Sequence, residues 1–514
     1  MLRLSAVVVS LLSVPQAATG EEVTPKRLSS LQVHEDLQLA IDAVEAAMPD
    51  IYWHQSSQTW TSAKAAALAQ TDDVEDAMGV YAVLTPLMAR IGEGHLSVGL
   101  PRAVMIEQME AGVGLPLDLH WNTTGVFISG AYGEAADIPV GSRLLEINGE
   151  GYDILLKELM AMVPHDGNIS TGPMRDGGGG RYAILRNRLR GAEQVFRLRY
   201  EKDGVVTERA VAATPFSNRK RPATVVNQVA SLDWIEPGLA YLNVPSFSNR
   251  AYREAGKTFR GEMQILFEEL HRKRATRLIL DLRENGGGSE PNESILYSFL
   301  VEAPLHKYAA VEARSREVIV TSHSGEVFSH LVFDADELFL QETLPDGRLR
   351  RLNLPPEGLM SHWQPSNPVF HGRLVILAGG YTFSGGAELA SMLHHVDRGV
   401  FVGEEVGGAH EGNTSGYSWV LTLPHSGVRL HVPLLQFRFN WPGVPGHRGV
   451  PAQCEVPPLV DEIGQRRDKA WRVALQVVNQ DWASPTEAMC PEPEEGALLS
   501  HRGGRDSSVR ETLP

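Results

Sequence analysis

The first part of the chain carries a helical pattern of apolar residues. From Leu28 to Met88 apolar side chains recur every three or four positions, and an Ala-rich run lies at Ala63 to Ala69. This spacing places them on one face of a helix. The pattern stops at Gly92, in the segment IGEGHLSVGL. It predicts a small helical N-terminal domain over residues 24–105.

Residues 107–215 have the alternation of apolar and polar positions that is typical of paired strands. The clearest strands are VGLPLDLHW and TGVFISGAY, and a hairpin turning at Asp203 and Gly204 ends the unit. A run of four glycines interrupts it, in MRDGGGGRY. No Lys-Ser/Thr pair follows the run, so we expect a flexible loop and no phosphate cradle. The pattern predicts a β-rich second domain.

Residues 225–478 alternate between apolar strands and amphipathic helices. Strands are predicted at RLILDL, at RLVILAG and at GVFVGE, with helices over Ala251–Arg274 and Gly386–Val396. Almost wholly apolar strands are typical of buried parallel sheets. The β-α-β order therefore predicts an α/β core with a mostly parallel sheet and helices on both faces. Residues 491–514 are polar and aperiodic, which predicts a disordered tail.

Composition narrows the class of protein. The 514 residues include 47 Lys and Arg against 63 Asp and Glu, a formal charge of −16. At about 100–200 residues per domain, this length predicts three domains. Contacts with nucleic-acid phosphates need clustered Lys and Arg, so the acidic balance argues against a nucleic-acid partner.

The N-terminus has the pattern of an export signal. Arg3 precedes a mostly apolar stretch from Ala6 to Val14, and small residues follow up to Gly20, which predicts a signal peptide over residues 1–20. No other stretch approaches the roughly 18 apolar residues that span a membrane. We therefore expect a periplasmic or extracellular protein. In that setting the two cysteines, Cys454 and Cys490, either form a disulfide or remain free thiols.

Two glycine-rich loops follow apolar strands of the predicted core. In open parallel sheets, sites gather at the carboxyl ends of strands. The first loop is DLRENGGG, from Asp281 to Gly288, and the second is AGGYTFSGGAE, where Ser384 precedes a predicted helix. Free N–H groups at a helix start favour a developing oxyanion beside a nucleophilic serine. The alternatives are a plain glycine-rich turn for the first loop and a helix N-cap for Ser384.

A nucleophilic serine needs a base within hydrogen-bond reach, normally His or Lys. A single lysine, Lys469, follows Ser384 in the sequence, and it lies in a charged C-terminal segment. A histidine is therefore the more plausible base. The candidates are His95, His394, His395, His410, His431 and His447. His95 is favoured because it lies in the glycine-rich loop GEGHLS, and functional side chains are commonly held on such loops.

The order of four segments resembles peptidase family S41, the tail-specific or C-terminal-processing proteases. These segments are LAYLNVPSF, LILDLRENGGG, LVILAGGYTFSGGAE and FVGEEVGGAHEGNTSG. The resemblance runs from about residue 80 to residue 478 and implies a crotonase-like ββα core preceded by a PDZ-like domain over residues 107–215. It implies that Ser384 is the nucleophile. It also implies that the amides of Gly385 and of Gly286 or Gly287 form the oxyanion hole.

One departure decides which branch of the family the chain resembles. The processing proteases use a Ser-Lys dyad, and Ala409 stands where that lysine is expected. The other branch, which resembles the tricorn core, takes a histidine from the segment before the PDZ-like domain, where His95 lies. That branch orients its histidine with a glutamate. Here Glu411 and Glu404 are the candidates for this third member.

The resemblance implies a serine peptidase that acts on exported proteins or peptides and needs no cofactor or metal. The PDZ-like domain implies capture of a substrate's C-terminal tail by strand addition, or else a rigid lid over the site. Two other functions stay open. A chain without the lysine could be a catalytically inactive S41-like ligand-binding protein, or the same residues could serve an esterase.

Overall fold

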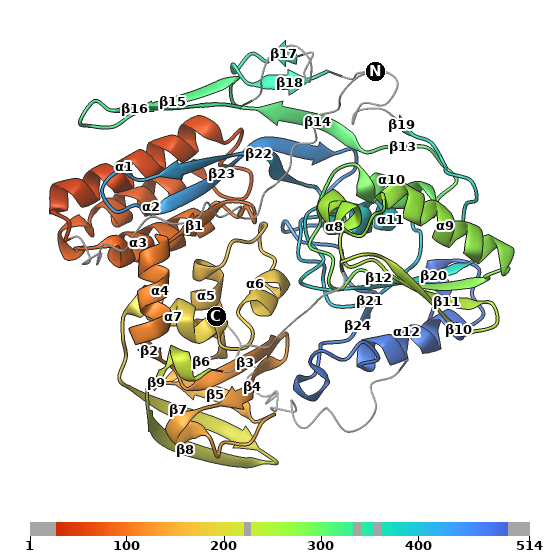
Figure 1. Cartoon of the computed structure of the whole chain (residues 1–514), viewed down its shortest axis with the longest axis horizontal. Coiled ribbons are helices and arrows are strands. Elements are labelled where there is room, and N and C mark those ends of the chain that lie inside the picture. Colours follow the sequence, from red (N-terminus) through yellow and green to blue (C-terminus); the bar gives the residue numbers. More distant parts are fainter. Residues whose placement is uncertain (1–26, 220–227, 333–340, 353–361, 492–514) are drawn as a thin grey trace, which may run out of the picture.

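The computed structural model describes residues 27–219, 228–332, 341–352 and 362–491. The predicted export signal and all but the first residue of the predicted tail lie outside these ranges. The described chain is a mixed α/β protein with helices and several sheets (Figure 1). In these ranges no helix combines the length and the apolar character needed to cross a bilayer.

A six-stranded sheet underlies the region predicted as the core. Its strands pair in the order β10-β11-β12-β20-β21-β24, and all pairs except β10 with β11 are parallel. Their bounds are β10 (Ser231–Glu236), β11 (Leu239–Asn243), β12 (Arg277–Asp281), β20 (Arg373–Ala378), β21 (Val400–Gly403) and β24 (Cys454–Glu455). Because β12 and β20 are neighbours, the loops that follow them meet at one edge of the sheet.

Both faces of this sheet are buried. Leu278 and Leu280 of β12 belong to the large core that also holds α9 (Phe259–Arg272), whereas Ile279 between them packs in a second cluster with α12 (Lys469–Asn479). Successive side chains of a strand point to opposite faces, which explains why the strand is apolar throughout. Figure 1 shows α12 on the opposite side of the sheet from α9.

Residues 113–216 contain a separate apolar cluster. An antiparallel sheet holds β3 (Leu117–Asn122), β4 (Gly125–Ala131), β5 (Arg143–Ile147), β7 (Val195–Lys202) and β8 (Val205–Ala212), and α5 (Tyr152–Met162) and α7 (Arg181–Arg190) contribute to its core. The glycine run predicted as a flexible loop is a tight turn before α7. Gly179 exchanges two backbone hydrogen bonds with Leu119, of 2.7 and 2.9 Å.

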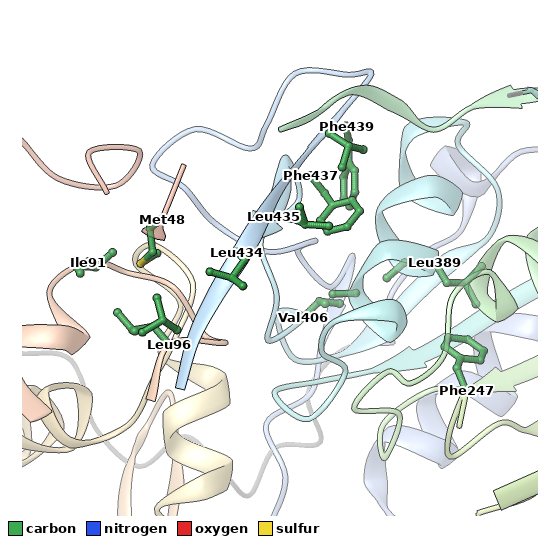
Figure 2. Close-up of a cluster of buried hydrophobic side chains, with 14 of the residues drawn as sticks. Met48, Ile91, Leu96, Phe247, Leu389, Val406, Leu434, Leu435, Phe437 and Phe439 are labelled. Carbon is green, nitrogen blue, oxygen red and sulfur yellow. The ribbon is translucent and has the colours of Figure 1, made fainter. Parts of the chain in front are cut away.

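A second six-stranded sheet joins the N-terminal helices to the rest. Its strands are β1 (Ser97–Gly99), β14 (Tyr308–Ala313), β17 (Gln341–Thr343), β18 (Leu349–Arg351), β22 (Gly412–Thr422) and β23 (Arg429–Phe439), paired antiparallel. The helices are α1 (Ser30–Ala47), α2 (Ser57–Leu68) and α3 (Ala77–Ala89). Their buried side chains belong to the same apolar cluster as the parallel sheet. Figure 2 shows this continuity from Met48, Ile91 and Leu96 through Leu434 of β23 to Leu389.

A disulfide joins Cys454 to Cys490. It connects β24 at the edge of the parallel sheet with the segment that follows α12. The last described residues are therefore covalently tied to the core.

Candidate active site

Ser384 lies at a strained turn between β20 and α11 (Gly385–His395). Its backbone angles, φ 50° and ψ −127°, are in a region that residues other than glycine rarely adopt. The hydroxyl makes no capping hydrogen bond to the helix, which removes the support for a purely structural N-cap. Backbone strain of this kind clusters at active sites, and a sharp strand-to-helix turn is how other hydrolases present a nucleophilic serine.

The glycine loop after β12 lies directly against this serine. A Cβ atom added to Gly287 would come within 2.7 Å of the Ser384 Cβ, 3.0 Å of its Oγ and 2.8 Å of the Gly385 nitrogen. The loop is held there by Asn285, whose carbonyl accepts from the Phe383 amide at 3.0 Å. The two loops predicted from their composition therefore meet.

The amides of the predicted oxyanion hole differ in their hydrogen bonds. Gly287 donates to the side chain of Asn285 at 2.9 Å, and Gly286 donates to the Glu284 carbonyl at 3.2 Å. Within the described residues, the Gly385 amide has no hydrogen-bond acceptor. It stands at the first position of α11, where the helix dipole favours negative charge. Gly385 is therefore the amide best placed to receive an oxyanion.

Gly287→Ala is expected to lower kcat by about 10²-fold or more, because the added methyl group must displace Ser384 or Gly385. The change is measured as the turnover of a fluorogenic peptide. Gly256→Ala is the matched control, since Gly256 also has a positive φ (70°) but open space around its Cβ. Equal activity of the two variants would contradict the close approach of Gly287 to the serine.

His95 lies beside the serine turn. Its ring stacks on the ring of Phe383, the residue before Ser384, with centroids 4.7 Å apart and planes 30° apart. The loop that carries it connects α3 to β1. His431, which faces Ser97 across the β1–β23 pair, hydrogen-bonds to the His95 backbone. These contacts bring a residue from the N-terminal segment to the edge of the parallel sheet.

The ring of His95 is electrically neutral at neutral pH. Burial lowers the pKa of His95 to about 4; the charge of Glu388 acts in the opposite direction, and that of His431 lowers the pKa further. Its Nδ1 atom is buried and has no hydrogen-bond partner among the described residues. A neutral imidazole can accept a proton from a serine hydroxyl.

The pH profile should show the depressed pKa of His95. With His95 as the expected base, protonation of its ring stops catalysis, so we expect kcat/KM to hold down to about pH 5 and to fall as the pH drops through about 4. A histidine with an unperturbed pKa would instead make kcat/KM fall near pH 6.5. Tryptophan fluorescence over the same range separates this limb from acid unfolding. An acidic limb near 6.5 in the folded protein would contradict the buried environment of His95.

The two glutamates predicted as a third member lie in other pairs. Glu411 accepts from His447 Nδ1 at 2.5 Å, and Glu404 faces the guanidinium of Arg175 at 3.4 Å. Neither has a contact with His95 among the described residues. The charge that raises the pKa of His95 is that of Glu388, which lies one helical turn after Ser384 on α11.

Asp166 is a site residue that sequence reasoning missed. Its carboxylate accepts from the Gly94 amide at 2.7 Å and from the Ala409 amide at 3.1 Å. It thus joins the His95 loop to the position where the Ser-Lys branch carries its lysine. Burial raises the pKa of Asp166 to about 6, although the two amides lower it. The sequence around it, PHDGN, has no pattern that would have identified it.

Lys307 is a second residue near the site that was not predicted, because it precedes Ser384 in sequence. It is buried and ion-paired with Glu293 and Glu388, and Glu293 Oε2 lies 3.8 Å from a Cβ built on Gly385. Burial would lower the pKa of Lys307, but the carboxylates of Glu293, Glu388 and Glu290 raise it. A lysine that stays charged cannot accept the serine proton.

The remaining candidate histidines lie in other contacts. His394 Nδ1 is 3.0 Å from His410 Nε2, and His395 stacks on Trp441. His447 pairs with Glu411. His95 is therefore the candidate that the structure places at the serine turn.

Residues 238–434, which carry both glycine-rich loops, match the family model "Peptidase family S41". The match identifies an S41 peptidase domain in the chain, and the protein is accordingly a hydrolase of peptide bonds. No curated protein sequence matches it.

Solved structures share the fold. Mature CPAF is 14% identical over 87% of this chain and 96% of its own, with a TM-score of 0.56. A point mutant of CPAF is 14% identical, with a TM-score of 0.57, and the match covers 88% of this chain and 98% of the mutant. CPAF complexed with lactacystin is 14% identical, with a TM-score of 0.55, and the match covers 84% of this chain and 95% of that chain. At this identity the likeness shows the fold alone.

Proposed function

We propose that this S41 peptidase is a serine peptidase in which Ser384 is the nucleophile and His95 the base. One observation carries the proposal: the His95 ring stacks on Phe383, next to the strained turn that bears Ser384. Ser and His in one site, with an amide at a helix start, are the groups that acyl transfer requires.

The reaction follows from these groups. The Ser384 oxygen attacks the peptide carbonyl as its proton passes to the His95 imidazole. The carbonyl oxygen becomes an oxyanion, held by the Gly385 amide and by Gly286 or Gly287 once that amide leaves its present acceptor. His95 then gives its proton to the leaving amine, and an acyl-enzyme forms. Water then attacks the acyl carbonyl as its proton passes to His95, and His95 returns this proton to the Ser384 oxygen as the acid leaves.

A fluorophosphonate probe tests the nucleophile on the full chain. The probe forms a phosphonyl ester with an activated serine, so we expect one adduct, mapped by mass spectrometry to the peptide that contains Ser384. Heat-denatured protein is the control and should not react. A folded chain that neither reacts nor cleaves peptides would favour the ligand-binding alternative. Ester turnover without peptide turnover would favour the esterase.

We further propose that the substrates are C-terminal tails of exported proteins, selected by a PDZ-like unit over residues 107–215. The unit has its own apolar core and an antiparallel sheet, and an edge strand of such a sheet can pair with an extended peptide. Test peptides with free and amidated C-termini separate tail recognition from the lid alternative. Faster cleavage of the free form is expected, and equal rates would defeat tail recognition without affecting the roles of Ser384 and His95.

A further inference from the structure

Three side chains outside the proposed catalytic groups converge from distant parts of the chain. His54 lies between α1 and α2, Glu411 directly precedes β22, and His447 lies in the loop after β23. One ring nitrogen of each histidine and one carboxylate oxygen of Glu411 lie within 4.8 Å of one another. Neither the family match nor the proposed mechanism uses this cluster.

An ion pair explains only part of the cluster. His447 Nδ1 contacts Glu411 Oε1 at 2.5 Å, which accounts for two of the three residues. His54 is not accounted for. Its side chain is 3% exposed, and its Nδ1 has no hydrogen-bond partner among the described residues. Its Nε2 lies 3.8 Å from Glu93 Oε1, which is too long for a hydrogen bond. Buried polar atoms are normally satisfied, so an orphan here indicates a missing partner.

The backbone holds the two imidazoles in place. A Cβ built on Gly92 would lie 3.0 Å from the His54 Cβ, and one on Gly167 would lie 2.7 Å from the His447 Cβ. The two rings meet at 80° with centroids 4.9 Å apart. This edge-on arrangement lets two imidazoles direct nitrogens at a common point. Close packing on both sides limits how far either ring can turn away.

We propose that His54, Glu411 and His447 form a binding site for a divalent transition-metal ion of the Zn²⁺ class. Two imidazoles and one carboxylate are a donor set that Zn²⁺ uses with water in a fourth position. The metal requires these donors at roughly 2.0–2.2 Å, so the three side chains must turn toward one another when the ion binds. His447 is 41% exposed, which provides an entry path, whereas Glu411 is 15% exposed.

The position of the site suggests a structural role. The His447 carbonyl accepts from the Asn168 amide at 3.1 Å, and the Gly92 carbonyl accepts from the Gly167 amide at 2.9 Å. A metal ion on His54 and His447 therefore fixes the loops that flank Glu93 to His95 and Asp166. It holds the segment that carries His95 without contacting Ser384.

Isothermal titration of the full chain, stripped with EDTA and titrated with ZnCl₂, tests the proposal. We expect one ion per chain, with a Kd that rises by at least about 10-fold in His447→Ala and in Glu411→Gln, because loss of even an outer-sphere partner costs about 10–100-fold. His371→Ala is the matched control: that histidine is 63% exposed and pairs with Glu302 at 3.6 Å. Both cysteines are in the disulfide, so no thiolate competes. Absence of binding at about 100 μM ZnCl₂, or unchanged affinity in both ligand variants, would overturn the site.

Melting temperatures with and without Zn²⁺ distinguish loss of the metal site from a general loss of stability in the variants. Zn²⁺ should raise the melting temperature of the wild-type chain and of His371→Ala, since a ligand that binds the folded state stabilises it by mass action. It should shift the melting temperature of His447→Ala much less, and this variant changes a surface-accessible side chain. An equal shift in all three proteins would place the ion elsewhere and overturn the assignment. Neither outcome bears on Ser384, so the test is separate from that of the peptidase mechanism.

Discussion

Ser384→Ala is expected to abolish peptide hydrolysis, with a fall in kcat of about 10⁶-fold, the size seen when a hydrolase loses its nucleophilic serine. In the proposed mechanism the Ser384 hydroxyl forms the acyl-enzyme, and we expect no neighbouring side chain in the described site to replace it. Residual rate acceleration would come from substrate binding and from the amides of the proposed oxyanion hole. The measurement is peptide turnover together with fluorophosphonate labelling, and both should disappear.

Ser391→Ala is the matched control for this substitution. Ser391 lies on the same helix, is fully buried, and its Oγ has no hydrogen-bond partner among the described residues. Removal of that hydroxyl leaves no partner unsatisfied, so we expect near wild-type turnover. The Ser384→Ala chain should keep the wild-type circular dichroism spectrum. Turnover above about 1% of wild type in a folded Ser384→Ala protein would exclude the proposed nucleophile.

Local patterns in the sequence predicted the elements that surround the serine. The apolar runs RLIL and RLVILA are strands β12 and β20, and the helix expected from Gly386 begins at Gly385. Strands that are apolar throughout and followed by glycines can be recognised from a window of a few residues. Adjacent parallel strands then place both following loops at one edge. The meeting of Gly287 and Ser384 follows from that topology.

Local patterns do not predict contacts between segments that are distant in the sequence. The long antiparallel strands β22 and β23 were not predicted, although β23 carries His431, which hydrogen-bonds to the His95 backbone. Asp166 and Lys307 act through partners far along the chain, and nothing in their neighbouring residues signals this. Glu411 and Glu404 are the candidates that the resemblance leaves for the third member, but their carboxylates pair with His447 and Arg175 from other loops. Side-chain pairing at a site depends on tertiary packing, which spacing alone does not encode.

His95→Ala is expected to lower kcat by at least about 10⁴-fold, because the serine loses the group that takes its proton. The depressed pKa of His95 keeps the wild-type ring neutral at pH 7, so the loss should be as large at pH 6 as at pH 8. His371→Ala, which changes an exposed histidine, should retain wild-type turnover. Fluorophosphonate labelling of His95→Ala should slow in parallel with peptide turnover. Wild-type labelling rates in that variant would exclude His95 as the base.

The double variant Ser384→Ala/His95→Ala distinguishes a catalytic pair from two independent effects. Residues that act as one unit are non-additive, so the double variant should be no slower than Ser384→Ala alone. If the two residues contributed independently, the rate reduction in the double variant would be the product of the reductions in the two single variants. If His95 only supported the fold near Phe383, the double variant would lose further activity and thermal stability together. A rate equal to that of the single serine variant, with the loss of stability confined to the histidine substitution, would show that the His95 imidazole acts through the Ser384 hydroxyl.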